Sequence, residues 1–107
     1  MRDNAVGGAL TETTFLILLA VWQGPRHGYG ILQFIREQTR GRVVLGAGTL
    51  YGALSALEKK GWLAAAEKGQ KKEYALTPAG REAVRRELDR LQAVEELARA
   101  ILKEEEP

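Results

Sequence analysis

The chain has 107 residues, of which 45% are hydrophobic and 28% are charged, with a formal net charge of +2, and this composition indicates one globular domain rather than a disordered or fibrous protein. It contains no cysteine, which excludes disulfides, thiolate metal sites and cysteine nucleophiles. The longest apolar run, Phe15 to Trp22, is too short to span a membrane and no secretory signal precedes it, so we expect a cytoplasmic protein without a membrane partner.

The first third of the chain predicts an arm followed by two helices. Residues 1–9 show no hydrophobic periodicity, so we expect a flexible arm there. Thr11 or Thr13 can cap a first helix, which is apolar nearly all round, predicts burial on more than one side, and ends at Gly24. A second, amphipathic helix is predicted between His27 and about Gly41.

Residues 42–45 are β-branched and bounded by glycines, which predicts a short strand or an extended link. A third helix is then predicted across residues 46–62. Leu50, Leu54 and Leu57 recur at helical spacing and form one apolar side, whereas the other side is small and polar. Such a helix is suited to lie in a groove of a partner, although an ordinary surface helix would carry the same pattern.

Residues 62–76 predict a β-hairpin with a basic, glycine-containing tip. Thr77-Pro78 begins a final helix that continues to about Glu104, roughly 26 residues or ~39 Å, which is longer than the body it leaves. Its apolar stripe is best buried against a second copy, although a tail folded onto its own domain is the alternative. The predicted dimerisation residues are Val84, Leu88, Leu91, Val94, Leu97 and Ile101.

The positive charge is concentrated in the middle of the chain. Between Pro25 and Lys72 there are nine basic and three acidic residues, a net charge of +6, whereas residues 73–107 carry −3. This asymmetry favours a polyanionic partner for the middle of the chain, with an uneven but merely solvated surface as the alternative.

The order of helix, helix, link, helix and hairpin predicts a mostly α fold with a small β-hairpin. It is a winged helix-turn-helix followed by a long C-terminal dimerisation helix, in which the third helix enters the DNA major groove. The predicted organisation is an arm at 1–9, a winged helix DNA-binding domain at 10–77 and a dimerisation helix at 78–107. No carboxylate pair, nucleophile–base set or metal cluster emerges, so neither an enzyme nor a cofactor is predicted.

Five short segments form a specific combination: Leu10-Thr11-Glu12, His27-Gly28-Tyr29-Gly30-Ile31, Gly48-Thr49-Leu50-Tyr51-Gly52-Ala53-Leu54, Leu57-Glu58-Lys59-Lys60-Gly61 and Tyr74-Ala75-Leu76-Thr77-Pro78-Ala79-Gly80. With these segments the chain resembles the PadR family of bacterial transcriptional regulators, and its one C-terminal helix is similar to the smaller subgroup. The resemblance implies a homodimer joined through the C-terminal helix. It also implies binding to a palindromic operator, usually as a repressor that a small molecule releases.

The chain departs from the family pattern at three places. Gly52 stands where the family often has proline. The wing has lysines at Lys71 and Lys72 but no arginine fork, which favours phosphate contact over insertion into the minor groove. Residues 78–107 contain no aromatic side chain, so the sandwiching of planar drugs by an aromatic residue of the last helix, known in some relatives, is not expected here.

We predict that base readout comes from the polar side of the third helix, from Thr49, Tyr51, Gly52 and Ser55. Tyr51 can reach DNA or pack its ring on the wing, and the sequence leaves both open. Contacts to the DNA backbone are predicted for Arg36, Lys59, Lys60, Lys68, Lys71 and Lys72. A small-molecule effector between subunits would be lined by Phe15, Leu19, Trp22, Leu91 and Val94, with a buried core position as the alternative for Trp22.

His27 is the only histidine, and without a second ligand it is a poor metal site, so a structural role at the start of the second helix is expected. Double-stranded DNA and a second copy of the chain are thus the predicted partners. The alternative is a winged-helix module that binds another protein through the same helix and hairpin and has no operator.

Overall fold

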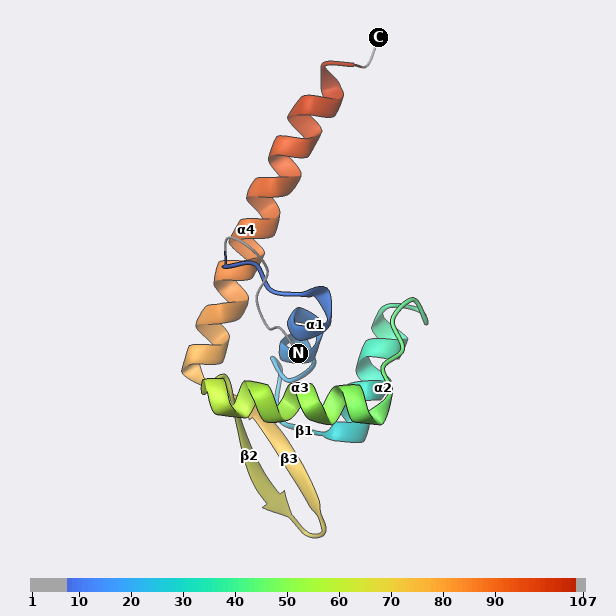
Figure 1. The fold of residues 1–107 in the computed structure, drawn as a ribbon, viewed down its shortest axis with the longest axis vertical. Coiled ribbons are helices and arrows are strands. Elements are labelled where there is room, and N and C mark those ends of the chain that lie inside the picture. The colour runs from blue at the N-terminus through green and yellow to red at the C-terminus, as the bar shows by residue number, and fades with distance from the viewer. Residues whose placement is uncertain (1–7, 106–107) are drawn as a thin grey trace.

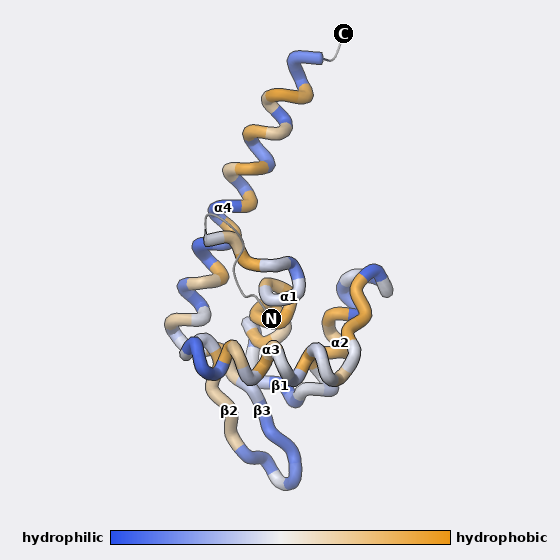
Figure 2. Tube along the Cα trace, in the orientation of Figure 1, coloured by the Kyte–Doolittle hydropathy of each residue, from blue (hydrophilic) through white to orange (hydrophobic). Residues whose placement is uncertain are grey.

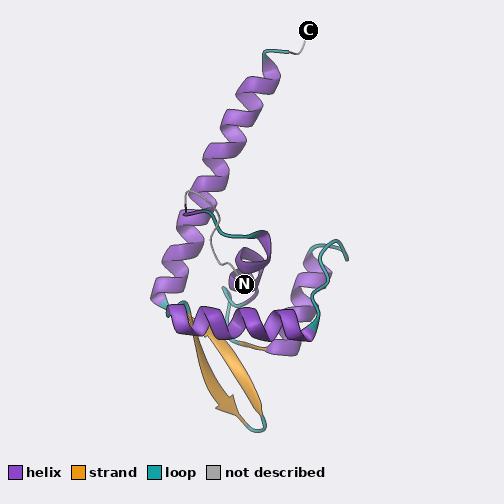
Figure 3. Ribbon diagram, viewed as in Figure 1, coloured by secondary structure: helices purple, strands orange, loops and turns teal. Residues whose placement is uncertain are grey.

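The computed structural model of the protein describes residues 8–105, which form four helices and a small sheet (Figures 1 and 3). In chain order the elements are α1 (Glu12–Ala20), β1 (Arg26–His27), α2 (Gly28–Gln38), α3 (Ala47–Lys60), β2 (Leu63–Lys68), β3 (Lys71–Leu76) and α4 (Pro78–Lys103). All four predicted helices and the hairpin are therefore confirmed. The predicted arm lies outside the described residues except for its last two positions, of which Ala9 is buried.

Local rules explain where the helices begin and end. Thr11 caps α1 by accepting a hydrogen bond from the backbone N–H of Thr14 at 3.2 Å. Thr77 caps α4 in the same way, and Pro78 occupies the first helical position, where its missing N–H costs nothing. Gly61 ends α3 in the left-handed conformation with φ of 84°, which glycine adopts without steric cost.

The sheet has three strands in the order β1-β3-β2, all antiparallel, where the sequence predicts two. The additional strand pairs Arg26 with Tyr74 and His27 with Glu73. A strand of two residues is too short to show the alternation of apolar and polar side chains by which strands are predicted from a sequence. Only the folded structure therefore reveals it. Residues 42–45 do not form a strand. They belong to an irregular connection whose Val43 and Leu45 pack against the core.

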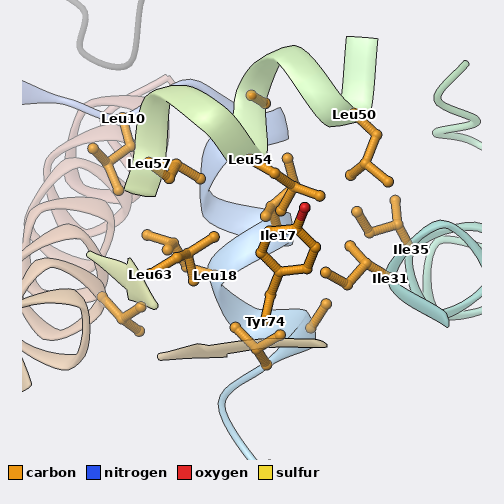
Figure 4. Close-up of a cluster of buried hydrophobic side chains, with 14 residues drawn as sticks. Leu10, Ile17, Leu18, Ile31, Ile35, Leu50, Leu54, Leu57, Leu63 and Tyr74 are labelled. Atoms are coloured by element: carbon orange, nitrogen blue, oxygen red, sulfur yellow. The ribbon is translucent and has the colours of Figure 1, made fainter. Parts of the chain in front are cut away.

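The core lies where α1, α2 and α3 meet above the sheet (Figure 4). Leu50, Leu54 and Leu57 of α3 are fully buried, which confirms the predicted apolar side of that helix. Tyr74 points from β3 into this cluster, and burial raises the pKa of its hydroxyl. The opposite face of α3 is thereby turned outward.

Helix α4 belongs to the body only in its first three turns. Gly80, Ala83, Val84 and Glu87 are buried, whereas the apolar residues from Leu88 onward are exposed. The rest of the helix projects away, so the molecule measures 60 Å in its longest dimension against 28 and 24 Å in the others (Figure 1). The predicted overhang is confirmed, and the core extends past residue 77 into α4.

The start of α4 is joined tightly to the end of α3. The Thr77 hydroxyl donates a 2.6 Å hydrogen bond to the carbonyl of Gly61, and the Thr77 N–H donates to the carbonyl of Trp62 at 3.1 Å. Gly80 packs directly on this turn, since a Cβ atom there would lie 2.3 Å from the Trp62 oxygen and 2.6 Å from a methyl of Leu76. We refer to residues 61–62 and 77–80 as the α3–α4 junction.

Glu87 is the one charged side chain that is buried among the described residues. It accepts a hydrogen bond from the Leu10 N–H at 3.1 Å and two from Arg90, at 2.9 and 2.5 Å. The hydrogen bonds from Arg90, assisted by the one from Leu10, lower the pKa of the Glu87 carboxyl against the opposing effect of burial. The carboxylate therefore ties the segment before α1 to α4.

Glu87→Gln is expected to lower the free energy of unfolding at pH 7 by about 1.5–3 kcal/mol, the range for hydrogen bonds to charged groups. Because the folded pKa is depressed, the stabilisation is present above the unfolded value near 4.3 and is lost as the pH falls through the folded value. The difference from wild type should therefore shrink below about pH 4. Urea unfolding at pH 7 and below about pH 4 measures this difference in the free energy of unfolding.

Glu82→Gln, which removes an exposed ion pair with Arg86 on the same helix, is the matched control. An equal loss of stability in both variants would contradict the role assigned to Glu87.

Candidate nucleic-acid interface

The four residues predicted to read bases lie together on the outer face of α3. Thr49, Tyr51, Gly52 and Ser55 are all exposed, while the leucines of the opposite face anchor the helix in the core. The face is shallow, because two of its four residues have side chains no larger than a hydroxymethyl group. A helix with such a face can approach a flat or grooved surface closely.

Tyr51 combines an exposed edge with a packed ring. Its side chain is 48% exposed, yet its ring lies so close to Gly28, the first residue of α2, that a Cβ atom there would be 2.4 Å from the hydroxyl oxygen and 2.8 Å from Cζ. The ring thus packs against α2 and also lines a cleft shared with the wing. A side chain at position 28 would therefore require the Tyr51 ring to move.

The hairpin of β2 and β3 forms a basic wing beside α3. Lys68, Lys71 and Lys72 are all exposed, and the tip of the hairpin and the adjoining half of β3 are strongly hydrophilic (Figure 2). Gly69 makes the turn with φ of 67°, and Lys68 stands opposite Lys71 across it. Cationic side chains are therefore brought together at the end of the wing.

A cleft of about 500 Å³ separates α3 from the wing. We call it the α3–wing cleft. It brings the predicted base-reading residues Tyr51 and Ser55 together with the predicted backbone-binding residues Lys71 and Lys72. The residues that line it are His27, Gly28, Tyr29, Tyr51, Ser55, Glu58, Gln70, Lys71, Lys72 and Tyr74. Sequence reasoning did not include His27, Tyr29 or Glu58 in this site, although a lone histidine just before a helix was a visible signal.

The other predicted backbone contacts lie outside this cleft. Lys59 and Lys60 are at the end of α3, where Lys60 stacks over the Trp62 ring at 4.6 Å. Arg36 lies on α2 and lines a second hollow of about 590 Å³ between that helix and the connection to α3. The six basic residues therefore form separate groups along the surface rather than one patch.

The apolar stripe on α4 is unpartnered over most of its length (Figure 2). Val84 is only 5% exposed and belongs to the core of its own domain, so it differs from the other five predicted dimerisation residues. The exposed stripe consists of Leu88, Leu91, Val94, Leu97, Ile101 and, in addition, Leu102. Large apolar side chains repeated along one projecting helix indicate a contact surface.

A groove of about 470 Å³ lies between α1 and α4 and contains three of the five predicted effector-lining residues, Phe15, Leu19 and Leu91. Val94 does not line it. Trp22 is instead stacked against α4, with the guanidinium groups of Arg81 and Arg85 at 4.6 and 5.3 Å from its ring. Trp22 thus fastens α1 to α4 outside the groove.

Two features are absent from residues 8–105. No helix there is long and apolar enough to cross a bilayer. No group of three or more histidine, aspartate or glutamate side chains is placed to hold a metal ion.

Comparison with known proteins identifies relatives of this arrangement. A family model described as the transcriptional regulator PadR-like family matches residues 17–86, from α1 through the wing into the buried turns of α4. An uncharacterized 37.1 kDa protein in transposon TN4556 of Streptomyces fradiae is 44% identical over 77 residues, which cover 71% of this chain and 22% of that protein. The chain thus spans only about a fifth of the length of this relative.

Solved structures share the fold. A transcriptional regulator from Clostridium thermocellum superposes with a TM-score of 0.74 at 25% identity, over 80% of this chain and 88% of that one. Bacillus subtilis PadR, in a complex with operator DNA, superposes with a TM-score of 0.62 at 23% identity, over 72% of this chain and 46% of that one. These similarities confirm the predicted fold class.

Proposed function

Because the chain belongs to the PadR-like family of transcriptional regulators, which are not enzymes, we propose that it binds double-stranded operator DNA as a homodimer. In this proposal it acts as a repressor at a palindromic operator, from which a small-molecule effector releases it. An operator-binding regulator works where the chromosome is, so the proposal includes a cytoplasmic location.

The observation that carries the proposal is the α3–wing cleft, where small polar groups of α3 face lysines of the wing. A recognition helix in the major groove reads base edges, while cationic groups beside it bind phosphates. The related Bacillus subtilis PadR was crystallised with operator DNA, which supports the same use of the fold. We assign base readout to Thr49, Tyr51, Gly52 and Ser55. Backbone contacts are assigned to Lys59, Lys60, Lys68, Lys71, Lys72 and Arg36.

The outer face of α3 has no arginine, asparagine or glutamine, the side chains that make strong bidentate contacts with guanine and adenine. Direct readout is therefore modest in this proposal. More of the specificity comes from the spacing of two half-sites and from DNA shape.

Dimerisation is assigned to the exposed stripe of α4. A second copy would cover five residues predicted for this role, Leu88, Leu91, Val94, Leu97 and Ile101, together with Leu102. Leu91 also lines the groove between α1 and α4, so a ligand bound there would lie beside the dimer contact. This adjacency supports effector control through that groove.

The first test is selection of bound sequences from random double-stranded DNA, followed by affinity measurements on the selected operator at several salt concentrations. We expect a palindrome. If each protomer neutralises ~4 phosphates, log affinity falls against log salt concentration with a slope of about −7. Lys71→Ala should weaken all sequences alike, whereas Ser55→Ala should alter discrimination between sites. A flat salt dependence, or no enriched sequence together with co-purification of one protein partner, would instead favour a protein-interaction module.

The same operator assay tests effector control. Compounds that fill the groove between α1 and α4 should release bound operator, and Leu19→Trp, which fills the groove with a larger side chain, should abolish that release. Release that is unchanged in this variant would place the effector elsewhere.

A further inference from the structure

His27 holds the wing against the start of α2 through one ring nitrogen. It is the N-cap residue of α2, but its side chain does not cap the helix; instead Nδ1 lies 3.0 Å from the backbone oxygen of Lys72. A carbonyl oxygen only accepts, so Nδ1 carries the proton and donates this bond. Nε2, the other ring nitrogen, has no hydrogen-bond partner among residues 8–105.

The ring lies in a cleft suited to an anion. Two lysines of β3 and the hydroxyls of Tyr51 and Ser55 line the same space as His27. The titratable and charged groups that surround the ring are Arg26, Tyr29, Tyr51, Glu58, Lys71, Lys72, Glu73 and Tyr74. In model peptides only the histidine side chain and the α-amino group titrate between about pH 5.5 and 8.5 among the groups of these types, so a variant that lacks the imidazole is needed to identify its contribution.

We propose that His27 is a DNA-backbone ligand of the α3–wing cleft, and that its Nε2 takes up a proton from solvent when a phosphate enters the cleft. The inference rests on the proposed operator binding and adds a pH-dependent contact to it. The Nδ1–H remains on the Lys72 carbonyl throughout, so the ring gains a second donor without losing its hold on the wing. The protonated ring then gives a charge-assisted hydrogen bond to the phosphate.

The sign of the effect follows from linkage. A phosphate beside the ring favours the imidazolium form of His27 over the neutral form. The bound state therefore holds the proton to higher pH than the free state. The gain in operator affinity is complete at pH values below the titration midpoint of His27 in the free protein. It is lost as the pH rises through the midpoint of His27 in the operator complex.

Because the chain has a single histidine, its Cε1–H signal in an NMR spectrum needs no assignment. The experiment follows this signal between pH 5.5 and 8.5 in the full chain, free and bound to the selected operator. We expect the titration midpoint to rise by about one pH unit on binding, which corresponds at the acidic end of the range to about a tenfold gain in affinity per protomer, or about a hundredfold for the dimeric complex. An unchanged midpoint overturns the inference, and this measurement needs no variant that has to fold.

Two variants separate the ring's two roles. The amide of His27→Asn can donate to Lys72 as Nδ1 does but cannot titrate, so operator affinity should keep its salt dependence and lose its pH dependence. His27→Gln places an amide near the position of Nε2 and releases the wing, so affinity should fall at every pH. Equal pH dependence in wild type and His27→Asn would refute the role of His27 while operator binding stands. Failure of the wild type to select any DNA would refute the proposed function itself.

Discussion

Val94→Asp combined with Ile101→Asp is expected to make the protein monomeric and to weaken binding to a two-half-site operator by about 10²–10⁴-fold. Both side chains are about half exposed on the projecting part of α4 and make no contribution to the core, so each domain should stay folded. If the variant dimerised, each protomer would bury two carboxylates against an apolar partner surface. Their desolvation would cost far more free energy than a single apolar contact across the dimer gains. Binding to a single half-site should be nearly unchanged.

The matched control is Ala93→Asp combined with Ala100→Asp. These positions are also exposed, carry the same seven-residue spacing, and lie one residue away on a different side of α4. Light scattering after size exclusion reports the mass, and fluorescence anisotropy reports operator affinity. A dimer that survives in the first variant, or one that is lost equally in the control, would refute the assignment of the stripe.

Gly80→Ala is expected to destabilise the protein by about 1–3 kcal/mol, the usual cost of overpacking a core. Helix propensity alone predicts the opposite, because alanine is favoured over glycine inside a helix by about 0.5–1 kcal/mol. The packing around Gly80 determines the sign of the change in stability. The new methyl would lie 2.3 Å from the backbone oxygen of Trp62, and a backbone atom cannot rotate away.

Gly52→Ala is the control for this change, since Gly52 is also within a helix and nothing lies within 4 Å of an added Cβ. Urea unfolding should show this variant slightly more stable than wild type and Gly80→Ala less stable. If both substitutions stabilise the protein, the close packing at the α3–α4 junction is wrong.

The parts of the fold that sequence reasoning predicted depend on neighbours in the chain. The caps at Thr11 and Thr77, the stop at Gly61 and the leucine spacing of α3 each involve residues within one or two turns. Such rules act locally and need no knowledge of what packs against the helix.

The unpredicted features all join segments that are distant in sequence. The strand β1 exists because β3, more than 40 residues later, lies beside it. The partners of buried Glu87 include Leu10, and Trp22 lies outside the groove between α1 and α4 because it stacks on two arginines of α4. In the candidate site, the faces of α3 and the wing were predictable, whereas the entry of His27 into their cleft required the third strand.

The buried first turns of α4 also have a mechanical consequence. Helix α4 is held against the body as far as Glu87, so its projecting part from Leu88 to Lys103 is a lever of 16 residues, about 24 Å long. A tilt of about 10° where this part leaves the body moves its far end by about 4 Å, which is roughly the rise of one base pair. In the proposed dimer, the distance between operator half-sites would therefore depend on how firmly these buried turns are held as well as on the stripe that joins the two copies.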